Sequence, residues 1–232
     1  MARIGRAARD PAVAFLLLFP LALLHLSGGA ASADLATFSV GLQALAWLGD
    51  WLFWALSLVL GVGVLWAIGR IEALELPWAA GSIFLILEGL FWGYIVGPLL
   101  LYLTQYLPLQ ATPLSIAQLH QSVALAAGAG LYEELLFRAG LLTGLYVLLV
   151  HFLRLFFGAT SAVTTVSFGL ALLLSSAAFA WAHSLGDPNA LIPDVLAFRL
   201  LAGVLFGLLF SWRGLAVAAW AHASYDSLLL FP

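Results

Sequence analysis

The chain has 232 residues, of which 64% are hydrophobic and only 8% charged, and its formal net charge is −3. Soluble domains are usually about 45–50% apolar and about 25% charged, so a folded globule could not cover its surface with so few polar groups. The composition therefore excludes a cytosolic enzyme, a nucleic-acid-binding protein and a secreted disulfide-bonded domain, and it predicts a polytopic membrane protein.

The apolar segments predict membrane-spanning helices throughout the chain. A spanning helix needs about 20 mostly apolar residues, and backbone groups in lipid must be hydrogen-bonded within their own segment. We expect an all-α bundle without a soluble domain, in which residues 1–110 supply helices without motifs and residues 111–232 form the motif-bearing core. The seven predicted spans, in chain order, are residues 12–26, 46–68, 78–104, 130–153, 163–183, 195–212 and 215–230.

Two parts of the chain have a second interpretation. A half-buried helix over residues 115–128 would raise the number of spans to eight. The first apolar segment is short and follows several arginines, and Ala31-Ser32-Ala33 is similar to a signal-peptidase site, so cleavage is an alternative to retention. Because further membrane helices follow, we expect a retained first span.

The positions of the arginines predict the orientation of the chain. The segments that connect alternate spans, residues 27–45, 105–118 and 184–194, contain no arginine. Six arginines lie on the other side of the predicted membrane: Arg3, Arg6, Arg9, Arg70, Arg154 and Arg213. The positive-inside rule then predicts a cytoplasmic N-terminus and an external C-terminus.

Ionisable residues inside the apolar segments mark a candidate site. A charge near mid-membrane costs from about 2.5 to more than 10 kcal/mol, so each such group needs a partner or a function. Glu134 and Arg138 lie four residues apart and are expected to form an ion pair. Glu133 points about 100° away from Glu134 and has no local cation, which suits a general base or acid. The alternative is a polar helix start with two solvated acids.

Two later spans carry further polar groups. His183 ends the fifth span, where an interfacial histidine bonded to a carbonyl is the simplest alternative to a functional role. His222 and Asp226 lie four residues apart on the seventh span, where a local hydrogen bond would satisfy both. The directions of the spans place Glu133 and these groups at similar depths in the outer half of the bilayer. We therefore predict that they converge in one site, suited to activating water for hydrolysis.

Three motifs, each on its own apolar helix, resemble the signature of the CPBP family (CAAX-protease and bacteriocin-processing, also called Abi). In chain order they are Glu133-Glu134-x-x-x-Arg138, Phe179-x-x-x-His183 and His222-x-x-x-Asp226. The resemblance covers roughly residues 128–230. It implies an intramembrane endopeptidase of the glutamic type, expected in the inner or plasma membrane of a prokaryote.

The resemblance also implies a role for each motif residue. Glu133 and His183 would activate the attacking water, His222 and Asp226 would line the oxyanion site, and the Glu134–Arg138 pair would support them. The best-known CAAX proteases have asparagine at the position of Asp226, and an ionised carboxylate cannot donate to an oxyanion. Asp226 is therefore also a candidate for orienting His222.

The resemblance implies a reaction without a cofactor, but a metal remains an alternative. Glu133, His183 and His222 would provide three zinc ligands and leave one coordination position open. The sequence contains no H-E-x-x-H zinc motif.

We predict a protease that cuts a membrane-associated or exported protein substrate in or beside the bilayer. Prenylated substrates fit least, because the inferred outer site would not meet a cytosolic CAAX tail. A second hypothesis is a non-proteolytic factor of the same family, in bacteriocin immunity or as a partner of another membrane protein. A third is a small transporter, in which Glu88, Arg199 and the glutamate pair would line a proton path.

Overall fold

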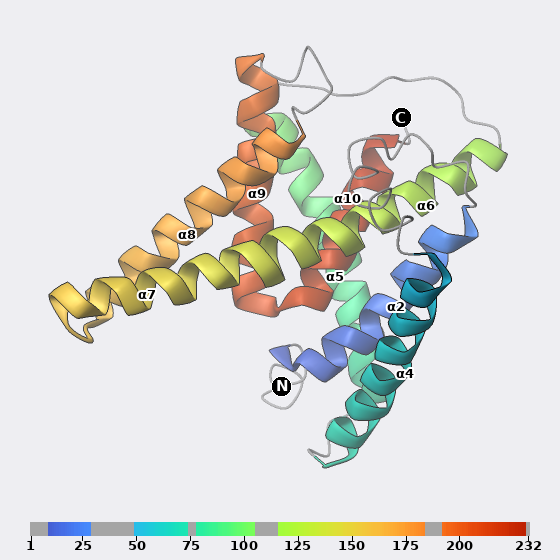
Figure 1. Cartoon of the computed structure of the whole chain (residues 1–232). Coiled ribbons are helices and arrows are strands. Elements are labelled where there is room, and N and C mark those ends of the chain that lie inside the picture. Colours follow the sequence, from blue (N-terminus) through green and yellow to red (C-terminus); the bar gives the residue numbers. More distant parts are fainter. Residues whose placement is uncertain (1–8, 29–48, 74–77, 105–115, 184–191, 231–232) are drawn as a thin grey trace.

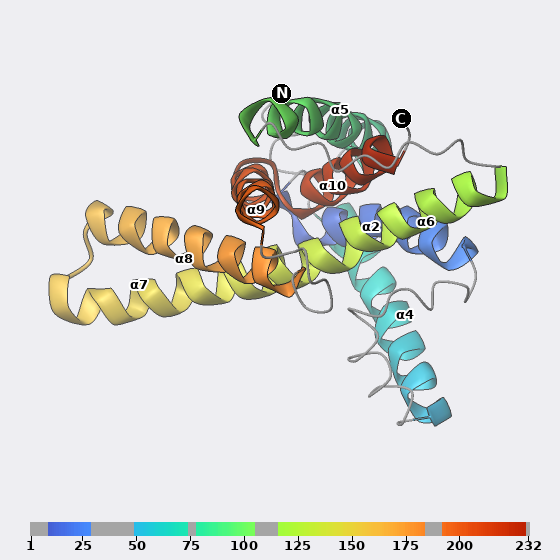
Figure 2. The same cartoon turned by 90° about the horizontal axis from the view of Figure 1, so that it is seen from above.

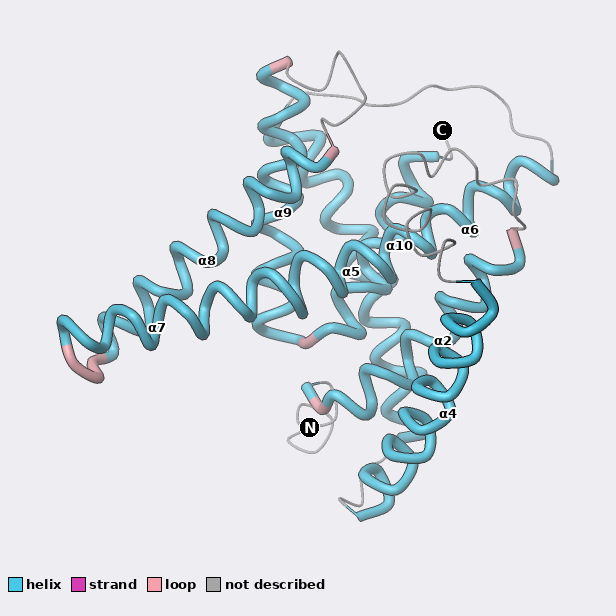
Figure 3. Tube along the Cα trace, viewed as in Figure 1, coloured by secondary structure: helices cyan, strands magenta, loops and turns pink. Residues whose placement is uncertain are grey.

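The computed structural model describes residues 9–28, 49–73, 78–104, 116–183 and 192–230. Within these ranges every regular element is a helix, which confirms the predicted all-α class (Figure 3). In chain order the elements are α2 (Pro11–Ser27), α4 (Gly49–Ala73), α5 (Trp78–Thr104), α6 (Ile116–Glu133), the π-helix η2 (Glu134–Leu142), α7 (Thr143–Phe157), α8 (Ser161–Ala182), α9 (Pro193–Arg213) and α10 (Leu215–Leu230). Ala31-Ser32-Ala33 lies outside the described residues.

The helices have the length and composition of membrane spans. Four stretches of the described chain are long and apolar enough to cross a bilayer: Gly81–Thr104, Gln118–Phe157, Ser161–Ala182 and Pro193–Arg213. The apolar helices α2 and α10 are shorter, with 17 and 16 residues. The protein is therefore an integral membrane helical bundle, while the number of seven or eight spans stays a prediction.

The predicted fourth span is part of one much longer helix. α6, η2 and α7 follow one another directly (Figure 1), and their apolar part has 40 residues. Residues 116–133 are helical, as the eight-span interpretation predicts, but they continue into the fourth span. At about 1.5 Å per residue the apolar part is about 60 Å long, twice the hydrocarbon thickness, so the helix must tilt or extend beyond the bilayer.

Small residues allow several helices to pack closely around α10. This helix contacts α2, α5, α6, α9 and η2, and it lies between α5 and α6 in Figure 2. A Cβ atom on Gly130 of α6 would lie 2.5 Å from the Ala219 carbonyl oxygen, and one on Gly93 of α5 would collide with the Ala221 carbonyl. Glycine is needed at such contacts because the backbones approach each other directly. α10, which carries His222, is thereby held from both sides.

Polar contacts join the helices at the end of the bundle where α9 meets α10. Arg70 of α4 forms an ion pair with Asp10, at 3.0 Å, and Arg213 binds both carboxylate oxygens of Glu88 on α5. Arg70 and Arg213 belong to the arginines that are predicted to face the cytoplasm. Glu88 is one of the groups on which the transporter hypothesis depends.

Reporter fusions test the predicted orientation. A reporter joined after Arg70 is expected to lie in the cytoplasm, and one joined after Pro232 outside, because an odd number of spans precedes the C-terminus and positive residues stay inside. The measurement is the paired activity of an enzyme that works only outside and a fluorophore that folds only inside. Detection of both fusions on the same side would refute the odd number of spans.

Candidate active site

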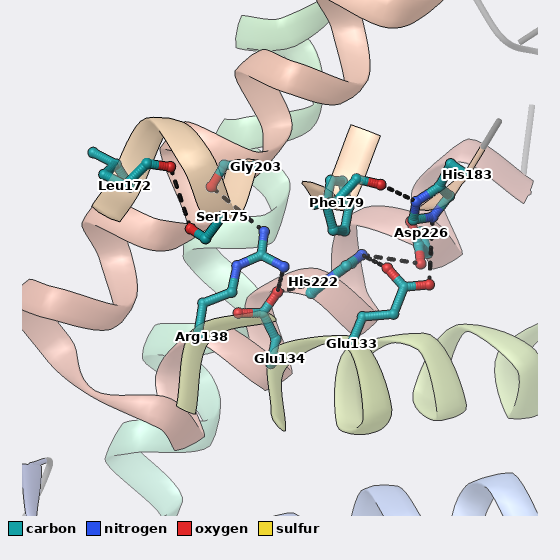
Figure 4. Close-up of polar contacts among 10 residues, drawn as sticks. All are labelled: Glu133, Glu134, Arg138, Leu172, Ser175, Phe179, His183, Gly203, His222 and Asp226. Carbon is teal, nitrogen blue, oxygen red and sulfur yellow. Dashed lines mark hydrogen bonds and ion pairs between the residues drawn. The ribbon is translucent and has the colours of Figure 1, made fainter. Parts of the chain in front are cut away.

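Three helices bring four of the predicted site residues together (Figure 4). Glu133 ends α6, His183 directly follows α8, and His222 and Asp226 lie one turn apart on α10. Glu133 Oε1 is 3.4 Å from His183 Nε2, and Glu133 Oε2 is 3.7 Å from His222 Nε2. Asp226 Oδ2 is 3.5 Å from His222 Nε2. The predicted convergence of these groups is confirmed.

The helix changes from α to π geometry between the two glutamates. Glu133 is the last residue of α6 and Glu134 the first of η2. π-Helical turns are rare and often occur at functional sites. Glu134 and Arg138 still meet, with Arg138 Nη1 3.0 Å from Glu134 Oε1, and both side chains are buried. The predicted ion pair is thus confirmed, although nothing in its spacing indicated a π-helix.

Glu134 has a second partner that the sequence did not reveal. Its Oε1 atom accepts a hydrogen bond from His222 Nδ1 at 2.8 Å. Since an ionised carboxylate only accepts, Nδ1 carries a proton, and the other ring nitrogen faces Glu133 and Asp226. The direct hydrogen bond that orients His222 is therefore the one to Glu134 on η2, and not one to Asp226, which lies on the same helix as His222. Glu134 links the buried Arg138 to the imidazole.

Aromatic rings enclose this polar cluster. Phe206 of α9 stacks on His222, with ring centroids 4.6 Å apart and an interplanar angle of 11°. The guanidinium carbon of Arg138 lies 4.6 Å from the ring centroid of Phe179. Such rings stabilise a cation and keep water away, which strengthens the electrostatic interactions inside. Phe179 belongs to a motif, whereas Phe206 has no feature in the sequence that distinguishes it from other apolar residues of α9.

His183 is fixed through one nitrogen and presents the other to Glu133. Its Nδ1 donates to the Phe179 carbonyl at 2.9 Å, so Nε2 is the nitrogen that faces the carboxylate. Its backbone carbonyl accepts a hydrogen bond of 2.9 Å from Arg199 Nη1. His183 is therefore bonded to a backbone carbonyl, as the simpler interpretation expects, but it is also part of the polar cluster. Sequence reasoning had not connected Arg199 with His183.

The geometry around Glu133 suits the binding of a water molecule. The residue is 7% exposed, and its Oε2 atom is buried without a hydrogen-bond partner among the described residues. The distances from its oxygens to the two imidazoles are longer than direct hydrogen bonds, which are about 2.7–3.2 Å. Glu133 Oε2 therefore has free capacity to accept a hydrogen bond. A water bound beside the Glu133–His183 pair would contact a base and a second proton-exchanging group.

Glu133, His183 and His222 are also the candidate zinc ligands. Among the residues that the structure describes, no group of three or more His, Cys, Asp or Glu side chains is arranged to hold a metal ion. The zinc alternative with Glu133, His183 and His222 stays a prediction.

Comparison with known proteins gives an independent result for the half of the chain that carries the motifs. Residues 115–228 match the family model described as type II CAAX prenyl endopeptidase Rce1-like. No curated protein and no solved structure matches the chain. The matched segment contains all three motifs and every residue of the cluster, and the family is a family of membrane proteases. Residues 115–228, just under half of the chain, are therefore similar to the Rce1-like family of CAAX-type proteases, which is consistent with the family resemblance of the three motifs.

Proposed function

We propose that the protein is an intramembrane endopeptidase in which Glu133 acts as general base. The observation that carries this proposal is the buried Glu133 carboxylate, which lies between His183 Nε2 at 3.4 Å and His222 Nε2 at 3.7 Å. Glu133 takes a proton from the attacking water, and the hydroxide forms a bond to the peptide carbonyl carbon. The proton then passes to the leaving amine when the carbon–nitrogen bond breaks, so atoms and charges balance.

His183 works with Glu133 on the same water. Because its Nδ1–H is bonded to the Phe179 carbonyl, only Nε2 is available to exchange a proton with the water or the leaving group. This pairing of a carboxylate with an imidazole on a different helix supports proton transfer in both directions during one turnover.

His222 and Asp226 have separate roles in the proposal. A His222 ring that carries a proton on Nε2 can donate to the oxyanion of the tetrahedral intermediate. An ionised Asp226 cannot donate, so we assign the oxyanion contact to His222 and the alignment of Nε2 to Asp226. The Glu134–Arg138 pair holds His222 from the other side of the ring, through its Nδ1 atom.

The substrate class follows from the family and from the predicted orientation. The family description names CAAX prenyl endopeptidases, which makes a prenylated C-terminal tail one candidate. The arginine positions predict that the site lies toward the outer side, where a cytosolic tail would not reach it. We therefore propose a membrane-anchored or exported protein as the substrate, with the prenylated tail as the alternative that the experiment includes.

The transporter hypothesis loses two of its groups. Both carboxylate oxygens of Glu88 accept hydrogen bonds from the Arg213 guanidinium, which neutralises the charge that a proton path would need. Arg199 donates to the carbonyl of His183 and so belongs to the frame of the candidate active site.

A pair of histidine variants tests the protease. His183→Gln is expected to lower cleavage of a membrane-anchored reporter peptide by at least about a hundredfold, because general acid–base catalysis contributes about 10²–10⁴. His151→Gln is the matched control. In both residues Nδ1 bonds the carbonyl four positions earlier, at 2.9 and 2.8 Å, but His151 is exposed on α7. Its rate is expected to equal that of the unmodified protein.

The assay uses the full chain in lipid vesicles, with an unprenylated and a farnesylated peptide as substrates. Incubation with a metal chelator is expected to leave the rate unchanged. A rate that falls tenfold or more and returns when zinc is added would replace the proposal by its zinc-dependent version. Absence of cleavage of either peptide would favour the non-proteolytic membrane factor.

A further inference from the structure

A groove lies at the end of the bundle that is predicted to face the cytoplasm. It has a volume of about 460 Å³ and lies between the start of α2, the segment η2–α7 and the turn from α9 to α10. Figure 1 shows the start of α2 next to this turn, below the long helix. Its wall is mainly apolar and includes Phe15, Leu18, Ala139 and Phe210. The groove has the size of a binding site for a small or chain-like ligand.

The arginine side chain of Arg9 lies at this groove. Among the residues that the structure describes, Arg9 is the only charged one that lines it. Its Nε and Nη2 atoms donate to the Trp212 carbonyl at 3.1 and 2.9 Å, so the guanidinium is fixed against the end of α9. These two contacts leave other N–H donors of the five that an arginine has. The neighbouring acid, Asp10, forms an ion pair with Arg70.

The environment identifies the ligand class. The groove belongs to an integral membrane protein, and its cation lies at the end with the arginines that are predicted to face the cytoplasmic leaflet. That leaflet carries anionic lipids, which attract basic residues at its surface. An acyl chain would fill the apolar wall, and a phosphate would accept charge-assisted hydrogen bonds from Arg9. We propose that this groove binds one anionic phospholipid, with its phosphate on Arg9 and an acyl chain between α2 and η2.

The position of the groove connects the lipid with the motif helix. Ala139 and Leu135 line the groove, and they alternate along η2 with Glu134 and Arg138 of the buried ion pair. A lipid in the groove would therefore pack against the π-helical segment itself. Bound lipid is expected to stabilise the folded protein, and this effect is independent of the proposed peptidase activity.

The experiment measures lipid binding and thermal stability of the full chain in detergent, with phosphatidylglycerol and phosphatidylcholine as the two probes. Phosphatidylglycerol is expected to bind more tightly and to raise the melting temperature. Arg9→Gln is expected to weaken phosphatidylglycerol binding about fivefold and to leave phosphatidylcholine unchanged, because one arginine near a lipid surface contributes about 1 kcal/mol. Arg9→Lys keeps the positive charge and is expected to keep most of the preference for phosphatidylglycerol over phosphatidylcholine. Arg154→Gln is the matched control, an exposed arginine on the same predicted side and outside the groove.

A second pair of variants tests the acyl-chain part of the groove. Thr143 is exposed and lines the groove, so Thr143→Phe fills it, whereas Thr143→Ala removes the hydroxyl without filling it. Only the phenylalanine is expected to abolish tight lipid binding. Equal binding of the two lipids, or equal weakening by Arg9→Gln and Arg154→Gln, would mean diffuse surface attraction and would overturn the proposal. Equal lipid binding by the two Thr143 variants would overturn it as well.

Discussion

Replacing Glu133 with glutamine is expected to lower cleavage by about 10²–10⁴-fold without changing the amount of folded protein. The amide has nearly the shape of the carboxylate but cannot take a proton from water. Glu133 Oε2 is buried without a hydrogen-bond partner among the described residues, so the substitution breaks no direct bond at that atom. The measurement is cleavage of the reporter peptide, beside the melting temperature in detergent.

Glu72→Gln is the control for this variant, because Glu72 is an exposed glutamate near the end of α4. It is expected to retain the rate and stability of the unmodified protein. If Glu133→Gln retained full activity while Glu134→Gln was folded but inactive, the roles of the two glutamates would be exchanged. If both variants cleaved the peptide at the normal rate, the protease proposal would fail.

The parts of the site that lie on one helix were predictable from spacing. Glu134 and Arg138 are four residues apart, and an ion pair at that spacing depends only on local helix geometry. The convergence of Glu133, His183 and His222 was predictable because hydropathy gave the directions of the spans and hence similar depths. These inferences need no knowledge of how the helices pack.

The contacts between helices were not predictable in the same way. The bond from His222 to Glu134 and the stacking of Phe206 depend on the rotation of α9 and α10 about their axes. An apolar span in lipid is hydrophobic all round, so its pattern does not show which face meets a neighbour. The sequence also did not predict that residues 116–157 form one helix, because this too depends on packing between helices. Gly130 is a weak helix former, but close packing against α10 requires a glycine there.

Glu134→Gln is expected to destabilise the protein by about 3–5 kcal/mol, which is the usual cost of removing one partner of a buried ion pair. Arg138 is 1% exposed and would keep its charge in a low-dielectric setting. For a chain of this size the loss corresponds to a fall in melting temperature on the order of 10 °C. Activity is expected to fall together with stability, whereas Glu133→Gln loses activity alone. The measurement is thermal unfolding in detergent with the cleavage assay beside it.

The double variant Glu134→Gln/Arg138→Met separates the two contacts of Glu134. Removing both charges leaves no uncompensated ion, so most of the lost stability is expected to return. Glutamine can still accept the hydrogen bond from His222 Nδ1, but without the carboxylate charge next to the ring, so catalysis is expected to recover less than stability. A double variant as unstable as the single one would show that the His222 contact, and not the stranded arginine, sets the stability of this part of the bundle. In that case Glu134 would act chiefly on the imidazole, and the prediction that its ion pair with Arg138 determines the stability would be wrong.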